Sequence, residues 1–130
     1  MKKQIILGNE ELFIIYTRRY LSKLFYSLGY DNYIQDKDSY IIITYSSKKL
    51  NQEIQIIYDF LRSDKLYYQI EVQFKIINNF EIKNIQIEPL EYFKDRVIPS
   101  TIESIISMIK ELFVRYLLED LKGERGLLSK

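Results

Sequence analysis

Apolar and polar residues alternate strictly along the middle of the chain. The apolar members of this pattern are Tyr68, Ile70, Val72, Phe74 and Ile76, and the polar members between them are Gln69, Glu71, Gln73 and Lys75. Successive residues of a β-strand point to opposite faces of a sheet, so the pattern predicts a strand with one buried face. Asn78 and Asn79 then favour a turn, and Pro89 ends the returning strand.

The returning strand changes phase along its length. Phe80 and Ile82 occupy even positions, whereas Ile85 and Ile87 occupy odd ones. In a regular strand half of these apolar residues would point into water, so the sequence predicts a β-bulge near residues 83–84. The pairs expected with that bulge are Ile76 with Phe80, Phe74 with Ile82, Val72 with Ile85, and Ile70 with Ile87.

Helical periodicity marks the N-terminal part of the chain. A helix is predicted that starts with Asn9 as its cap and ends just before Gly29, which favours a left-handed backbone. Its expected apolar positions are Phe13, Ile14, Tyr16, Tyr20, Leu21, Leu24, Phe25 and Leu28. Two short strands are expected next, at Asp31–Gln35 and Tyr40–Tyr45, around the turn Asp36–Ser39.

The segment Asn51–Arg62 fits two patterns. As a strand it places on one face the residues Ile54, Ile56, Tyr58 and Phe60. As a helix it places on one stripe the residues Leu50, Ile54, Ile57, Tyr58 and Leu61. The isoleucine content and the turn-like run Ser46–Lys49 favour the strand, and the helix stays open as the alternative.

The C-terminal part contains the strongest helical pattern. Ser100–Glu103 has the spacing of a capping box, and Gly123 provides a stop, so a helix is predicted from Ser100 to Lys122. At about 1.5 Å per residue it would be roughly 35 Å long. Its apolar stripe consists of Ile102, Ile105, Ile106, Ile109, Leu112, Phe113, Tyr116, Leu117 and Leu121.

Together these elements predict an α+β fold, with an N-terminal helix, an antiparallel meander of four to five strands and a long C-terminal helix packed on the sheet. A chain of 130 residues has the usual size of one domain, so a single domain is expected over residues 1–123, followed by a flexible tail over 124–130. The helix–sheet–helix order is loosely similar to several small dimeric chaperone and adaptor folds, although no sequence motif accompanies that similarity.

The composition removes much of common catalytic chemistry. The chain contains no histidine and no cysteine, so it has no imidazole base, no thiolate and no preferred zinc ligand. A protein without catalytic activity, metal or cofactor is favoured, and an enzyme that uses carboxylates, lysine or tyrosine in a pocket stays open. The absence of alanine indicates an AT-rich genome, for example that of a virus or an organelle.

Charge and hydropathy set the expected environment. The net charge of +1 predicts no general attraction to nucleic acid. No apolar run has the length of a secretion signal or a membrane span, so a soluble, intracellular protein is expected.

The helices provide two candidate binding surfaces. The apolar arc of the C-terminal helix is wide enough to cover the sheet and also to meet a partner, and the candidate interface residues are Val114, Tyr116, Leu117, Leu118 and Leu121. A candidate basic patch consists of Arg18, Arg19, Lys23, Lys48 and Lys49.

These surfaces favour a non-enzymatic interaction protein with an adaptor, chaperone-like or assembly role. It would act through an apolar helix face or an edge strand, as a homodimer or with another protein. The alternative is a weakly basic protein that binds nucleic acid or nucleotides through the first helix.

Overall fold

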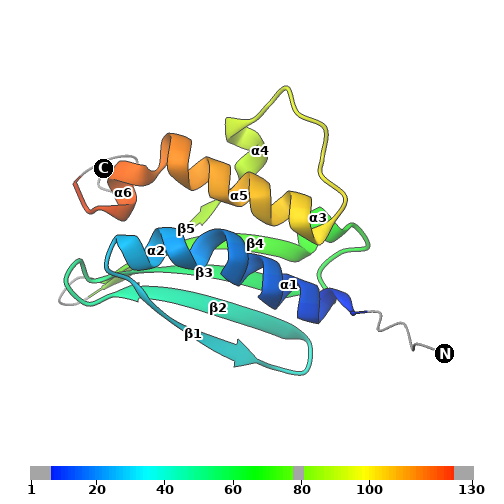
Figure 1. Ribbon diagram of the computed structural model, residues 1–130, viewed down its shortest axis with the longest axis horizontal. Helices are drawn as coiled ribbons and strands as arrows, with labels where there is room; N and C mark the ends of the chain where they lie inside the picture. The colour runs from blue at the N-terminus through cyan, green and yellow to red at the C-terminus, as the bar shows by residue number, and fades with distance from the viewer. Residues whose placement is uncertain (1–6, 78–80, 125–130) are drawn as a thin grey trace.

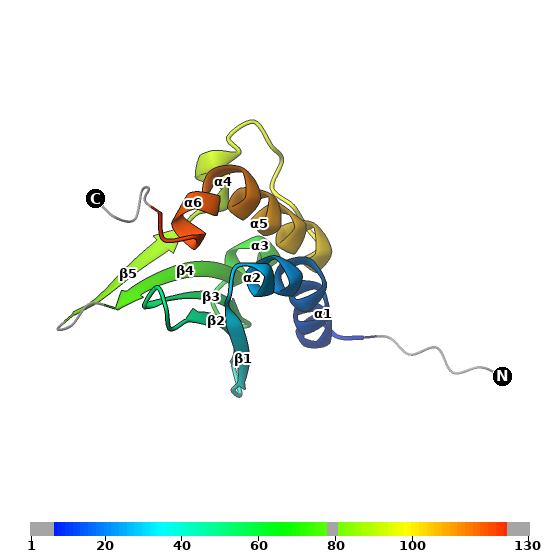
Figure 2. The same ribbon diagram turned by 60° about the vertical axis from the view of Figure 1, so that its left-hand side comes forward.

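The computed structural model describes residues 7–77 and 81–124 and folds them into two layers. One layer is an antiparallel sheet, and the other consists of two long helical segments that lie side by side and run in the same direction (Figures 1 and 2). This arrangement confirms the predicted α+β fold. The predicted turn at Asn78 and Asn79, the expected pairing of Phe80 and residues 125–130 of the predicted tail lie outside the described residues.

The sheet is a meander in which strand order follows chain order. Its strands are β1 (Asp31–Asp36), β2 (Tyr40–Ser47), β3 (Gln52–Asp59), β4 (Ile70–Ile77) and β5 (Ile82–Ile87). All neighbouring strands pair antiparallel. Because the strand order follows chain order, β1 and β5 form the two edges of the sheet. The ambiguous segment is a strand, as favoured, because alternation buries Ile54, Ile56 and Tyr58 under the helices.

The N-terminal helix is continuous and contains one wide turn. It consists of α1 (Asn9–Thr17), the π-helical η1 (Arg18–Ser22) and α2 (Lys23–Ser27). Residues at four-residue spacing are fully buried along it, namely Phe13, Thr17, Leu21 and Phe25. Four residues exceed the 3.6 of an α-helical turn, and a π-helical hydrogen bond spans one residue more than an α-helical one. The wide turn therefore keeps this row of side chains against the sheet.

The N-terminal helix differs from the prediction in two details. Ile14, Leu24 and Leu28 were expected in the buried stripe but are only partly buried, because the four-residue row displaces the stripe toward Thr17. Gly8 takes the cap position expected for Asn9, which is the first helical residue.

The C-terminal helix is divided at Leu117. α5 (Ile102–Tyr116) crosses the sheet beside α1 and is about 22 Å long, and α6 (Leu118–Leu121) follows as one short turn (Figure 1). The prediction of one continuous helix is wrong here. In a continuous helix Leu121 would lie roughly 120° around the axis from the buried Ile109, away from the sheet. The break returns Leu121 to the core, where it is fully buried.

Gly123 ends the C-terminal segment, as expected. Its φ is +71°, in the region where a side chain is disfavoured, and an added Cβ would lie 2.7 Å from Leu50 Cδ2 in the β2–β3 turn. This close approach holds the end of α6 against the sheet.

Thr101 caps α5. Thr101 Oγ1 accepts a hydrogen bond from the Ser104 N–H at 3.1 Å, and Ser104 Oγ accepts one from the Thr101 N–H, also at 3.1 Å. The predicted capping box was one residue too early. Glu103 instead accepts a hydrogen bond at 2.7 Å from the Tyr20 hydroxyl, which links α5 to the first helix.

Thr101→Ala is expected to lower the free energy of unfolding by about 1 kcal/mol, because the Ser104 N–H loses the Thr101 Oγ1 acceptor and the capping box is broken. Ser100→Ala is the matched control and should leave stability within about 0.5 kcal/mol of the parent chain. Urea unfolding followed by circular dichroism measures both. Equal effects at the two positions would mean that Thr101 is not the cap of α5.

The start of the hairpin formed by β4 and β5 differs from the prediction. β4 begins at Ile70 and not at Tyr68, because Leu66–Gln69 form the short helix α3. Tyr68 is consequently 42% exposed and does not contribute to the core face of the strand.

The predicted β-bulge is absent. β4 and β5 pair in an unbroken register, with Val72 opposite Ile87, Phe74 opposite Ile85 and Ile77 opposite Ile82. By alternation Ile82 points to the face without helices, where it is 61% exposed. The bulge was inferred because every isoleucine was assumed to reach the core, and an edge strand does not meet that assumption.

Another short helix follows β5. α4 (Pro89–Tyr92) begins immediately after Glu88, whose carboxylate accepts a hydrogen bond from the Leu90 N–H. The Tyr67 hydroxyl also donates to this carboxylate. Burial, and then this hydrogen bond, raise the pKa of Tyr67 above its usual range, so its hydroxyl stays protonated and anchors α3 to the end of β5.

Candidate interaction surfaces

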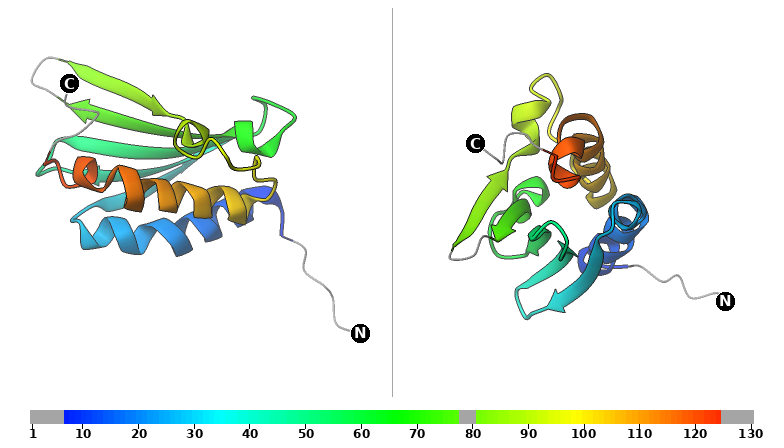
Figure 3. Two further views of the ribbon diagram at one scale, coloured as in Figure 1. Left: turned by 90° about the horizontal axis from the view of Figure 1, so that it is seen from above. Right: turned by 90° about the vertical axis from the view of Figure 1, so that its left-hand side faces the viewer.

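No helix of the described segments covers the face of the sheet opposite α1 and α5 (Figure 3). The strand register places on this open face a row that crosses all the strands, namely Tyr33, Thr44, Gln55, Gln73 and Gln86. Gln55 is only 7% exposed and its Nε2 lies 3.4 Å from Thr44 Oγ1, so neighbouring side chains cover the centre of the row. The open face therefore presents uncharged polar groups at its centre and lacks a broad apolar patch there.

The edge formed by β1 carries charge within the strand. Asp31 and Asp36 are exposed at its two ends. Its core side is reached by α2, because Asn32 Nδ2 donates to the Tyr26 hydroxyl at 2.6 Å. Charged residues on an edge strand oppose pairing with another chain, so β1 has the features of a protected edge.

The edge formed by β5 is less protected. Within the strand only Lys83 is charged, and the apolar Ile82 is largely exposed. Ile85 points to the core side but is only partly buried, because the helix layer does not extend fully over β5 (Figure 3). Next to Ile82 on the open face lies Ile77, which is also exposed. β5 thus combines an edge position with exposed apolar residues.

The sequence pattern indicated an edge strand in general terms and did not identify β5. The signal was present in the phase change at Ile82. That change marks an apolar residue that points away from the core, whereas it was interpreted as a bulge that would bring the residue inside.

The candidate apolar face of the C-terminal helix divides into two groups. Leu117 and Leu121 are fully buried, so they belong to the core of the folded chain. Val114 is 44% exposed, Tyr116 is comparably exposed, and Leu118 is partly buried. The ring of Tyr116 contacts that of Tyr92 of α4 in a tilted arrangement at a centroid distance of 5.3 Å. Only Val114 and Leu118 remain as a possible contact stripe, which is small for a protein interface.

The candidate basic residues are all exposed but are distributed over two elements. Arg18, Arg19 and Lys23 lie on the first helix, and Lys48 and Lys49 lie in the β2–β3 turn. Consecutive helical residues project about 100° apart, so Arg18 and Arg19 point in different directions. Arg19 covers the ring of Tyr16 at 5.2 Å from its centroid. The described structure does not gather these cations around a single groove.

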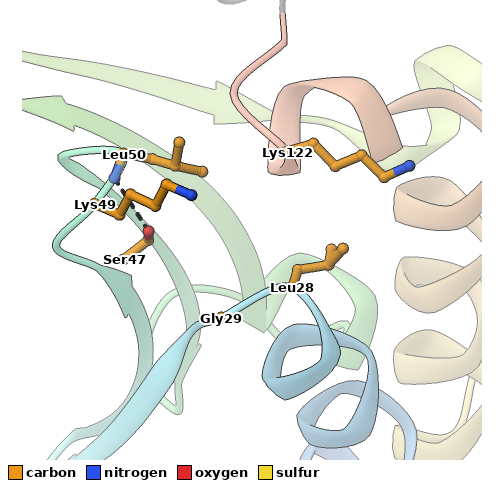
Figure 4. A pocket seen from close by; sticks show the side chains of 6 residues that line it. All are labelled: Leu28, Gly29, Ser47, Lys49, Leu50 and Lys122. Carbon is orange, nitrogen blue, oxygen red and sulfur yellow. Dashed lines mark hydrogen bonds between the residues drawn. The ribbon is translucent and has the colours of Figure 1, made fainter.

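A shallow hollow of about 230 Å³ opens at the end of the sheet near Gly29. Its walls are formed by Leu28, Gly29, Ser47, Lys49, Leu50 and Lys122 (Figure 4). Ser47 Oγ accepts a hydrogen bond from the Leu50 N–H at 3.2 Å and so belongs to the turn. Sites for small molecules usually exceed about 300 Å³, and no carboxylate lines this hollow. Its two lysines therefore have no acidic partner with which to form a proton-transfer pair there.

The buried tyrosines have a structural role. Burial raises the pKa of Tyr30 and of Tyr45 to about 12, although the hydrogen bonds of these hydroxyls with Gln52 and Ser22, respectively, oppose the shift. Both hydroxyls are therefore protonated near neutral pH and cannot act as bases. In residues 7–77 and 81–124 no cluster of acidic side chains has the size of a metal site.

An ion cluster joins α5 to the segment after α4. Glu111 binds two guanidinium groups, with Arg96 Nη1 at 2.9 Å from Oε1 and Arg115 Nη1 at 2.8 Å from Oε2. Arg96 also lies over the ring of Phe93, at 4.3 Å from its centroid. The hydrogen bonds from Arg96 and then Arg115 lower the pKa of Glu111 from 4.5 to about 2.

The lowered pKa of Glu111 predicts that its carboxylate makes a pH-dependent contribution to the stability of the fold. A carboxyl with a lowered folded-state pKa stabilises the fold above its unfolded pKa of about 4.5, and the contribution is lost as the pH falls toward 2. The difference in stability between the parent chain and Glu111→Gln should therefore be present at neutral pH and disappear in acid. The exposed Glu91→Gln is the control for a general charge effect. A difference that persists unchanged at low pH would contradict the role of the ionised carboxylate.

Comparisons of the chain with models of protein families, with curated proteins and with solved structures find no match. Among the helices of the described segments, none has both the length and the apolar character needed to cross a bilayer.

Proposed function

We propose that this chain is a non-enzymatic interaction protein that forms a homodimer. The observation that carries the proposal is the outer edge of β5, which pairs with no further strand among the described residues and lies beside the exposed Ile82 and Ile77. Unpaired N–H and C=O groups on a sheet edge are a template for pairing with another chain, and natural edges are normally blocked. The candidate apolar face of the C-terminal helix supports the proposal less, since Leu117 and Leu121 are buried.

The test is the molar mass in solution, measured by size exclusion with light scattering over about 1 to 100 μM. The sample is treated with nuclease and washed in high salt beforehand. The mass is expected to rise with concentration toward twice the 15.8 kDa of one chain. A mass of one chain at every concentration would refute the homodimer.

The same experiment, run without the nuclease and salt steps, tests the alternative of nucleic-acid binding. In that case the untreated sample would carry nucleic-acid absorbance that is lost at high salt. Replacing Arg18, Arg19 and Lys23 by glutamate would then abolish binding. An untreated sample free of nucleic acid would refute this alternative.

A further inference from the structure

The two edges of the sheet differ in charge. β1 carries Asp31 and Asp36 within the strand, whereas β5 carries only Lys83. Pairing two copies of β1 would bring an Asp31 and an Asp36 close together at each end of the ladder, and charged residues on an edge strand oppose pairing with another chain. Two copies of β5 would bring together one lysine from each chain. Charge therefore opposes pairing with a second copy of the chain less at β5 than at β1.

The core side of the sheet also favours β5. Ile85 belongs to the core face, as its pairing with the buried Phe74 shows, yet it is only partly buried. The helices lie mainly over the other strands, and β5 extends beyond them (Figures 2 and 3). A second sheet joined at this edge would cover Ile85 without any change in the fold of either chain.

We infer that two copies of the chain pair antiparallel through β5 about a two-fold axis at Ile85, so that their sheets become one continuous sheet. This inference rests on the proposed homodimer and names its interface. A two-fold axis perpendicular to the sheet keeps both core faces on the same side, so a residue on the axis lies opposite its own copy.

The side-chain pairs created by this axis are compatible. Ile85 lies against Ile85 of the second copy, and Asn84 lies opposite Gln86, so apolar meets apolar and amide meets amide. Lys83 lies opposite Ile87, so the two lysines stand at opposite ends of the paired strands. An axis at Asn84 would instead place Lys83 opposite Ile85. The axis at Ile85 therefore sets the two partly buried isoleucines directly against each other.

The size of this interface predicts its strength. Five residues of each β5 strand, Lys83 to Ile87, pair about this axis, and they bury less than the ~800 Å² per partner of a standard interface. The dimer is thus expected to dissociate reversibly, with a dissociation constant on the order of 10 μM.

Cysteine cross-linking tests the interface directly, because the chain has no native cysteine. Opposed residues in antiparallel strands have Cα atoms about 4.5 or 5.5 Å apart, within the range that a disulfide spans. Ile85→Cys should form a covalent dimer under mild oxidation at high protein concentration. Ile34→Cys is the matched control, since Ile34 is also a partly buried, core-side isoleucine in an edge strand. We expect at least about tenfold more dimer from Ile85→Cys.

A second pair of variants guards against a folding defect at Ile85. Asn84 and Gln86 are both exposed, so cysteine at either position should leave the fold intact. An equimolar mixture of Asn84→Cys and Gln86→Cys chains should give the mixed disulfide in excess over either homodimer, as the register predicts.

The outcomes separate the interface from the proposed function. If light scattering shows a dimer but the β5 variants do not cross-link selectively, the inferred interface is wrong and the homodimer stands. If light scattering shows a monomer, both are wrong. Equal cross-linking of Ile34→Cys and Ile85→Cys would also overturn the inference, because random collisions would explain it.

Discussion

Phe25→Ala is expected to lower the free energy of unfolding by about 3–5 kcal/mol. Phe25 is fully buried where the first helix, the sheet and α5 meet. Its ring stacks on Tyr45 of β2 at a centroid distance of 4.3 Å and meets the edge of Phe113 of α5 at 5.3 Å. Alanine would leave a cavity among three elements that cannot close without moving a helix. The loss would be a large fraction of the stability of an ordinary domain.

The neighbouring Tyr26 provides the control for Phe25. It lies on the same helix but is more than half exposed. Tyr26→Ala should cost less than about 1 kcal/mol, mostly through the hydrogen bond from Asn32. Chemical denaturation of both variants gives the comparison. Similar losses at Phe25 and Tyr26 would mean that the first helix does not pack on the sheet as described.

Gln52→Glu is expected to be the most destabilising polar substitution, with a cost of about 3 kcal/mol at neutral pH. Gln52 is buried, and its Nε2 donates to the Tyr30 hydroxyl at 2.6 Å and to the Asp120 carbonyl oxygen at 2.8 Å. Tyr30 in turn donates to the Leu121 carbonyl oxygen at 2.6 Å. These bonds attach the end of α6 to β3. A carboxylate of the same shape cannot donate, and its charge would face the carbonyl oxygens.

The cost of Gln52→Glu should depend on pH with a defined sign. Burial and the nearby carbonyl oxygens disfavour the charged form, so the introduced carboxyl would titrate above its unfolded value. Its penalty should therefore be largest at neutral pH and shrink as the pH falls and the group becomes protonated. Gln86→Glu, at an exposed position of β5, should show little effect at any pH. A pH-independent cost at Gln52 would indicate a packing defect and not a buried charge.

Residue spacing was sufficient to predict the fold class and the antiparallel meander, although the exact ends of the strands differ. The strand favoured for Asn51–Arg62 is observed over Gln52–Asp59, because Ile54, Ile56 and Tyr58 alternate on one buried face. The break at Leu117 was not predictable in the same way. It depends on where the sheet ends and on the approach of Gly123 to Leu50, which are tertiary contacts that leave no local pattern.

The candidate surfaces were predicted less well than the fold. Helical spacing alone could not show that Leu117 and Leu121 turn back into the core. Too many residues were therefore assigned to the exposed apolar face of the C-terminal helix. The exposed isoleucine of β5 was visible as a phase change, but an edge strand and a bulge produce the same change in one sequence. Only the strand order distinguishes them.

Hydrogen–deuterium exchange at two protein concentrations, above and below the dissociation constant, tests self-association through β5 most directly. In an edge strand about half of the backbone N–H groups point away from the sheet, and pairing with a second copy would protect them. The account predicts that amides of Ile82–Ile87 exchange more slowly at high concentration, while those of Asp31–Asp36 are unchanged. Exchange in β5 that does not depend on concentration, in a sample that light scattering shows to be dimeric, would contradict it.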